Sequence, residues 1–145
     1  MNAPDADGFD AVVAQTEQAL MAFARGDSSG MKSLLSSSED VLLANPLGPP
    51  VRGLSAVETA TDRAVAAIAD GTCEFEELAR FATADLGYVF HIERVVARLG
   101  DREEPRRFAL RVTTVYRRED GGWKIVLRHA DPIMTPRPID SILEN

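Results

Sequence analysis

The sequence predicts an α+β fold in which N-terminal helices pack on one side of a strongly bent antiparallel sheet. Helical patterns occupy the first half of the chain, and four strand-like segments follow between residues 73 and 133. Helices followed by strands are typical of α+β proteins, because one face of the sheet is then buried under the helices. The last two strands meet at Asp120-Gly121, a dipeptide favoured in tight hairpins because it tolerates positive φ.

The bulk properties indicate one globular domain. A chain of 145 residues can form one sizeable core, and its 45% apolar content is ordinary for a globular protein. We expect a flexible tail over residues 1–8, a single domain over 9–136 and a C-terminal tail over 137–145. No apolar run approaches the roughly 20 residues that span a bilayer, and the acidic N-terminus lacks the pattern of a signal peptide. The sequence therefore predicts a cytoplasmic protein without a membrane partner.

The charge balance argues against nucleic acid as a partner. The chain has 23 acidic and 16 basic side chains and a formal net charge of −7, which repels phosphate backbones. Cys73 is the one cysteine, so no internal disulfide can form. The two histidines have none of the spacings typical of metal ligands, and no cofactor motif is found. We expect neither a metal nor a cofactor.

Three helices are expected before residue 72. Residues 9–25 form the first, because apolar side chains recur there near the 3.6-residue period. A short second helix is expected over residues 30–37. The third starts at Ser55 with a capping box, runs to about Ala69 and ends at Gly71.

The strands begin with a short apolar segment at residues 41–45. A turn rich in proline follows, and residues 51–53 return from it. The four longer strands are expected over residues 73–82, 86–98, 106–118 and 123–133.

A two-residue turn at Asp120-Gly121 sets the expected register of the last hairpin. The expected pairs are Arg118 with Trp123, Tyr116 with Ile125, Thr114 with Leu127, and Val112 with His129. Tyr116, Leu127 and His129 then share a mostly apolar face that lines a pocket. The opposite face carries Arg111, Arg117, Lys124 and Arg128. A one-residue bulge would move every later side chain of the strand to the other face.

The order of these landmarks resembles the SnoaL-like and ketosteroid-isomerase-like branch of the nuclear transport factor two-like superfamily. The resemblance rests on Ala24-Arg25-Gly26-Asp27, on Asn45-Pro46 through Val51-Arg52-Gly53, on residues 84–89, and on residues 119–126 leading into Arg128-His129. It implies a cone, a cystatin-like roll in which the bent sheet wraps around the helices, and in many members a homodimer through the outer sheet face. The final hairpin is also similar to the association domain of calcium/calmodulin-dependent kinase, a non-catalytic member.

The resemblance also shows two departures from the ketosteroid isomerases. Their general base is an aspartate before a proline, and the matching residue here is Asn45, whose amide cannot take a proton at neutral pH. Their oxyanion-hole tyrosine in the first helix aligns near Ala19. Steroid isomerisation is therefore not expected, and Asn45 is expected to contact a ligand.

The candidate catalytic residues are His129, His91 and Glu93. His129 lies on the expected inward face and can exchange a proton near neutral pH, although it could instead be a hydrogen-bonded histidine at the cone rim. Both faces of the strand that holds His91 and Glu93 are partly apolar, and the resemblance to the kinase domain favours these two inward. They could act as base and acid, form a buried pair that satisfies itself, or lie outward at a dimer contact.

The candidate ligand-binding residues are Asn45, Tyr116, Thr114, Leu127 and Asp131. Tyr116 and Thr114 are expected to line the pocket as ordinary strand residues. Asp131 could orient His129 or cap the end of its strand, and we prefer the cap.

The sequence thus predicts a SnoaL-like protein that binds a small apolar or amphipathic ligand in an apolar, cone-shaped pocket. One alternative is an isomerase-, cyclase- or dehydratase-type enzyme without a metal, in which a pocket histidine is the general base. Another is a non-catalytic dimerisation module. A homodimer is expected through the outer sheet face, where Val115 and Val126 lie among arginines.

Overall fold

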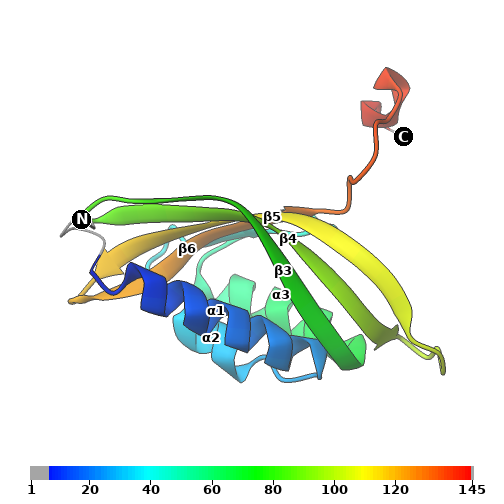
Figure 1. The fold of residues 1–145 in the computed structure, drawn as a ribbon, viewed down its shortest axis with the longest axis horizontal. Coiled ribbons are helices and arrows are strands. Elements are labelled where there is room, and N and C mark those ends of the chain that lie inside the picture. Colours follow the sequence, from blue (N-terminus) through cyan, green and yellow to red (C-terminus); the bar gives the residue numbers. More distant parts are fainter. Residues whose placement is uncertain (1–6, 145) are drawn as a thin grey trace.

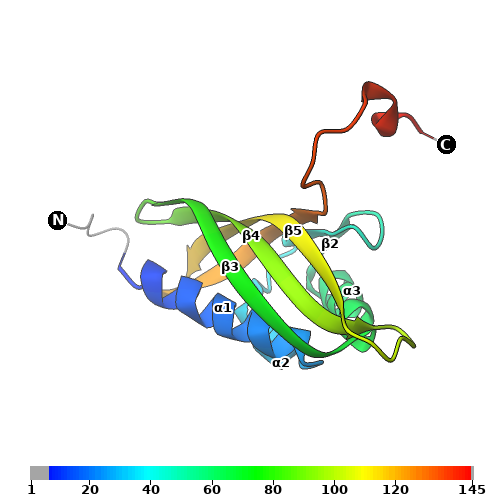
Figure 2. The same cartoon turned by 45° about the vertical axis from the view of Figure 1, so that its right-hand side comes forward.

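The computed structural model describes residues 7–144 of the chain (Figures 1 and 2). Its helices are α1 (Phe9–Ala24), α2 (Ser29–Leu34) and α3 (Leu54–Ala66), with a 3₁₀ turn η2 (Ile139–Ile142) near the C-terminus. Its strands are β1 (Leu42–Ala44), β2 (Val51–Arg52), β3 (Ile68–Ala82), β4 (Leu86–Leu99), β5 (Arg106–Glu119) and β6 (Gly122–Asp131). The expected α+β fold class is confirmed.

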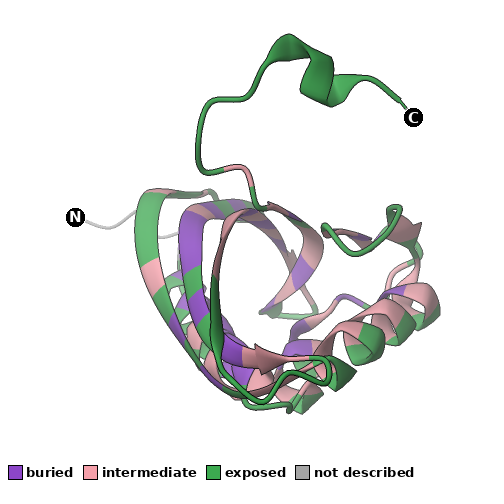
Figure 3. Ribbon diagram, turned by 90° about the vertical axis from the view of Figure 1, so that its right-hand side faces the viewer, coloured by how far each residue is buried: buried purple, intermediate pink, exposed green. Residues whose placement is uncertain are grey.

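The six strands form one sheet in the order β2-β1-β6-β5-β4-β3. The sheet bends into an arch, and the helices lie on its concave side (Figure 3). The four long strands pair antiparallel, as expected, whereas β1 pairs parallel to β6 through Leu42↔Leu127 and Ala44↔His129. No tight turn joins β1 to β6, so nothing in the local sequence fixes their relative direction.

The third helix ends earlier, and the following strand begins earlier, than the sequence predicts. α3 ends at Ala66 and β3 begins at Ile68, which pairs with Leu99 of β4. Gly100, just after β4, donates its N–H to the Ala67 carbonyl at 2.9 Å. In a longer helix, that carbonyl would instead accept the N–H of a residue in the next helical turn. A break in the register follows, where Asp70 has a φ of 55°. Tertiary pairing therefore overrides the helical pattern of this segment.

Gly71 lies where β3 passes the end of α1. A Cβ atom built on it would lie 2.6 Å from both the Ala24 carbonyl oxygen and the Ala97 Cβ. Backbone on one side and a packed strand on the other leave little room for movement. The close approach of α1 to the sheet therefore requires glycine at this position.

We expect Gly71→Ala to destabilise the fold by about 1–3 kcal/mol, the usual range for overpacking a filled interior. Urea unfolding monitored by circular dichroism measures the change. Gly48→Ala is the matched control, because a Cβ there meets nothing within 4 Å, and it should leave the midpoint almost unchanged. Equal midpoints for the two variants would contradict the packing described.

The interior is solidly packed at the end of the arch that holds the start of α1. Phe9 packs edge-on against Tyr116 and Trp123, with ring centroids 5.3 and 5.1 Å away. The Tyr116 hydroxyl donates a hydrogen bond of 2.7 Å to Thr16, which donates to the Val12 carbonyl at 2.8 Å. The aromatic cluster fills this end of the interior, and the cavity described below lies at the other end of α1.

Candidate ligand pocket

A β-bulge in β6 decides which side chains enter the interior. The turn at Asp120-Gly121 forms as expected, with φ values of 50° and 81°, and Tyr116 pairs with Ile125. The next pair is Val115 with Leu127, so Val126 is an extra residue on β6.

Beyond the bulge, the expected faces of β6 are reversed. Thr114 pairs with Arg128, Thr113 with His129, and Val112 with Ala130. Arg128 and Ala130 therefore line the interior, whereas His129 is exposed on the convex side and Leu127 is half-buried there. The expectation that Leu127 and His129 line the cavity is wrong, because the added residue shifts the alternation by one.

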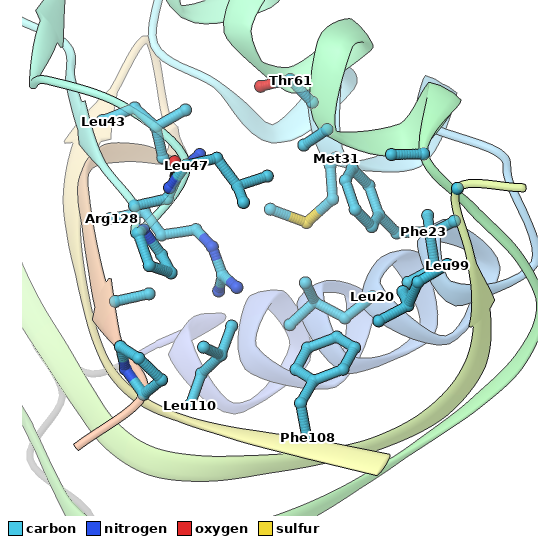
Figure 4. Close-up of a pocket in the computed structure, with 18 residues that line it drawn as sticks. Leu20, Phe23, Met31, Leu43, Leu47, Thr61, Leu99, Phe108, Leu110 and Arg128 are labelled. Carbon is cyan, nitrogen blue, oxygen red and sulfur yellow. Dashed lines mark hydrogen bonds between the residues drawn. The ribbon is translucent and has the colours of Figure 1, made fainter. Parts of the chain in front are cut away.

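A cavity of about 380 Å³ lies at the open end of the arch (Figure 4). Its described lining residues are Leu20, Phe23, Met31, Leu43, Asn45, Pro46, Leu47, Thr61, Ala64, Ala67, Ile68, Leu99, Gly100, Phe108, Leu110, Arg128, Ala130 and Pro132. They come from all three helices, from strands β1, β3, β4, β5 and β6, and from neighbouring loops. Its volume is within the range of small-molecule sites, and its lining is predominantly apolar.

Arg128 is the one charged residue among the described residues that line the pocket. Its side chain extends from β6 into the cavity (Figure 4). Two of its nitrogens, Nη1 and Nη2, donate hydrogen bonds of 2.8 and 2.7 Å to the two carboxylate oxygens of Glu93. This bidentate geometry is the strong form of an arginine–carboxylate pair.

His91 extends this pair into a buried chain of three polar side chains. Its Nε2 lies 2.8 Å from Oε2 of Glu93, and the side chains of His91 and Glu93 are 5% and 3% exposed. An ionised carboxylate only accepts hydrogen bonds, so Nε2 carries the hydrogen and donates. The chain therefore runs from His91 through Glu93 to Arg128, and of the three only Arg128 lines the pocket.

Glu93 stays ionised despite its burial. Burial alone would raise the pKa of Glu93, but the charge and hydrogen bonds of Arg128, together with the His91 hydrogen bond, lower this pKa from 4.5 to about 2. A carboxylate held in this way is a fixed negative charge that orients Arg128. It is a poor proton acceptor near neutral pH.

The lowered pKa predicts a specific acid response. Because the unfolded state takes up the Glu93 proton at a higher pH than the folded state, stability present above pH 4.5 is lost as the pH falls towards about 2. The difference in unfolding free energy between wild type and Glu93→Gln should narrow over this range, by on the order of 3 kcal/mol. Denaturant unfolding at a series of pH values measures it, and a carbon NMR titration of the Glu93 carboxyl in wild type gives the folded pKa directly. A carboxyl that titrates near its ordinary value would contradict the prediction.

The other residues singled out from the sequence lie in different places. Asn45 lines the pocket, and its side-chain oxygen accepts the Leu47 N–H at 2.9 Å. Tyr116 is buried in the aromatic cluster, where burial raises its pKa to about 12. Thr114 is also buried, and its hydroxyl has no hydrogen-bond partner among residues 7–144. Neither Tyr116 nor Thr114 is among the described residues that line the pocket, so the expectation that they line it is wrong.

Asp131 caps the end of β6. It accepts the Ile133 N–H at 2.9 Å and two hydrogen bonds of 2.8 Å from Arg111. The capping role preferred from the sequence matches these contacts. Asp131 pairs with Arg111 in the sheet, on the convex side together with His129.

Sequence reasoning missed Arg128 and the contribution of the helices to the pocket. Strict alternation from the Asp120-Gly121 turn predicts Arg128 on the outer face with three other basic residues. One signal was available, because Val126 and Leu127 are adjacent apolar residues that interrupt the alternation of β6. Leu20 and Phe23 belong to the apolar positions of the first helix, but their place beside the cavity depends on how α1 crosses the sheet.

Two other features bear on the kind of site. In the described part of the chain, no group of three or more His, Cys, Asp or Glu side chains could hold a metal ion. Among residues 7–144, no helix is long and apolar enough to cross a membrane.

Fold and site together define an arched-sheet α+β protein with an apolar pocket at its open end. A SnoaL-like domain model matches residues 12–135, and the chain belongs to this family. No curated protein matches the chain.

Solved structures agree with this assignment. A candidate type II calcium/calmodulin-dependent protein kinase association domain from Thiobacillus denitrificans is 27% identical, with a TM-score of 0.61, over 92% of this chain and 98% of that one. A candidate dehydratase of the NTF2-like family from Streptomyces avermitilis is 23% identical, with a TM-score of 0.74, over 91% and 99%. A ketosteroid isomerase-like protein from Erwinia carotovora atroseptica is 15% identical, with a TM-score of 0.72, over 88% and 98%. The likenesses below 25% identity establish the fold alone.

Proposed function

We propose that this protein binds a small, mainly apolar molecule through a neutral hydrogen-bond acceptor, such as a ketone or ester carbonyl. The observation that carries the proposal is the apolar cavity of about 380 Å³ into which the Arg128 guanidinium extends (Figure 4). A guanidinium has five N–H donors, and Glu93 accepts hydrogen bonds from two of its nitrogens. The remaining N–H groups can donate to a ligand.

The charge balance of the site favours a neutral acceptor over an anion. Glu93 neutralises Arg128, so a second carboxylate at the guanidinium would be buried close to the Glu93 charge without a cation of its own. Burying an unpaired charge costs several kcal/mol, whereas a carbonyl brings no net charge. The apolar lining contacts the rest of the ligand, and the Asn45 amide, which also lines the pocket, offers a second polar contact.

Three probes of nearly equal shape test this selectivity. They are 2-acetylnaphthalene, 2-ethylnaphthalene and 2-naphthoate, which differ in carrying a neutral carbonyl, no acceptor and a carboxylate. We expect calorimetric titration to show the ketone binding most tightly, about tenfold or more above the hydrocarbon, since a hydrogen bond to a charged group contributes about 1.5–3 kcal/mol. Tightest binding of 2-naphthoate would overturn the charge argument, and no preference among the probes would overturn the role of Arg128.

Binding is favoured over acid–base catalysis by the make-up of the pocket. None of the described lining residues is His, Asp, Glu, Lys or Tyr. His91 and Glu93 lie behind Arg128 and hydrogen-bond each other, and the exposed His129 is on the convex side. These contacts support a positioning role for His91 and Glu93.

We also propose a homodimer through the convex face of the sheet. Facing strands bring Tyr88 opposite Val115, and Val115 opposite Leu127, on this side. Two of the arginines there are paired within the chain, Arg94 with Glu76 and Arg111 with Asp131, each at 2.8 Å. Two copies could therefore meet without strong repulsion from these groups. A single 15.8 kDa species in sedimentation at micromolar concentration would contradict the dimer.

A further inference from the structure

Residues 132–144, here called the C-terminal arm, project away from the body of the protein. The arm leaves the end of β6 and rises from the convex side of the sheet, opposite the helices (Figures 1 and 3). Every residue from 134 to 144 is exposed. The arm therefore has almost no packing against the rest of its own chain.

The tip of the arm is apolar and locally ordered. Ile139, Ile142 and Leu143 are 76%, 74% and 69% exposed, the three largest exposures among the large apolar side chains described. The 3₁₀ turn η2 gathers them, with backbone hydrogen bonds of 3.0 Å from Ser141 to Pro138 and 3.1 Å from Leu143 to Asp140. A cluster of exposed apolar side chains marks a surface that interacts with another molecule.

The base of the arm fixes its direction. Asp131 is held by two hydrogen bonds from Arg111 and accepts the Ile133 N–H, which orients the first turn away from the sheet. Pro132, Pro136 and Pro138 restrict φ and remove N–H donors, so this segment stays extended and joins no strand ladder. The apolar tip is thus held at a distance from its own sheet.

We infer that the arm tip packs on a second copy of this chain, against the exposed apolar side chains of the β3–β4 hairpin. The receiving residues are Leu78, Phe81 and Tyr88, which are 53%, 56% and 39% exposed. Phe81 pairs with Tyr88 across the hairpin, with ring centroids 6.2 Å apart. Both surfaces are apolar, and the arm projects from the convex side, where Tyr88 also lies.

The reach of the arm and the charges near it fit a second copy. From Pro132 to Ile139 an extended chain spans roughly 23 Å at about 3.3 Å per residue, about twice the ~10 Å spacing of packed sheets. The formal charge of −7 opposes association, but three carboxylates on this side, Glu76, Asp131 and Asp40, are each neutralised by an arginine of the same chain. A symmetric dimer places two arms on two hairpins, and each contact occurs twice.

The inference rests on the homodimer proposed above. Sedimentation equilibrium distinguishes a failure of the dimer proposal from a failure of the proposed arm contact. Ile139→Ser/Ile142→Ser should weaken dimerisation by at least about tenfold. Leu47→Ser, which changes a side chain that is 66% exposed at the pocket, is the matched control and should leave the dimer unchanged. A monomeric wild type overturns both proposals, whereas a dimer that withstands the double substitution overturns only the role of the arm.

Cross-linking identifies the receiving chain. A photoreactive benzoylphenylalanine is placed at position 142, and ¹⁵N-labelled and unlabelled proteins are mixed, equilibrated and irradiated. We expect cross-linked peptides that join an arm of one isotope to a β3–β4 hairpin of the other. Peptides of a single isotope only would show that the arm folds back on its own chain, and cross-links to another region would place the receiving surface elsewhere; either result overturns the inference.

Discussion

Arg128→Met is expected to lower the free energy of unfolding by about 3–5 kcal/mol, the usual effect of removing one partner from a buried ion pair. The substitution leaves the Glu93 carboxylate, whose side chain is 3% exposed, without its bidentate partner. The His91 hydrogen bond remains, but it does not supply the lost positive charge. Guanidinium unfolding monitored by Trp123 fluorescence measures the change.

Two further variants show whether the unpaired charge is the cause. Arg128→Met/Glu93→Met removes both charges and should regain a large share of the lost stability, because apolar replacements of a buried pair are often neutral or stabilising. Arg94→Met breaks the pair with Glu76, whose side chains are 51% and 54% exposed, and should cost about 1 kcal/mol or less. Equal losses for Arg128→Met and Arg94→Met would contradict the buried chain of His91, Glu93 and Arg128.

Ala130→Phe is expected to abolish most binding of 2-acetylnaphthalene. Ala130 is buried and lines the cavity, so the added ring occupies the space that the ligand needs. If the ligand loses about 100 Å² of apolar contact, the binding free energy becomes weaker by about 2.5 kcal/mol, at about 25 cal/mol per Å². The affinity measured by calorimetry should therefore fall roughly 70-fold.

The neighbouring residue provides the control. His129→Ala changes a side chain on the convex side and should leave the affinity for the ketone unchanged, with circular dichroism verifying the fold of both variants. If His129→Ala weakened binding and Ala130→Phe did not, the register of β6 beyond Val126 would be wrong.

Most of the fold follows from local patterns in the sequence. The helical period of α1, the long alternating strands and the Asp120-Gly121 turn each depend on neighbouring residues, and all three form as expected. The start of β3 and the parallel pairing of β1 with β6 depend on distant segments. The residue pattern within one segment does not show which distant segment it will pair with or in which direction.

The sequence predicts an apolar pocket, but it does not predict which polar side chain enters it. The apolar interior follows from alternation, and Asn45 follows from the resemblance to the isomerases. The bulge at Val126 reverses the end of β6 and exchanges His129 for Arg128 in the interior. Glu93 accepts from Arg128 across the sheet, and this pairing joins residues 35 positions apart in the chain. One inserted residue therefore changes the expected site from a histidine to an arginine–glutamate pair.

The position of 2-acetylnaphthalene in a crystal of the complex tests the central proposal most directly. We expect the naphthalene rings to lie against Leu20, Phe108 and Leu110, with the carbonyl oxygen about 2.7–3.2 Å from a guanidinium nitrogen of Arg128. Glu93 should keep both of its hydrogen bonds to Arg128 in the complex. A ketone bound on the convex face, or one whose carbonyl points to the mouth of the pocket away from Arg128, would contradict the proposal.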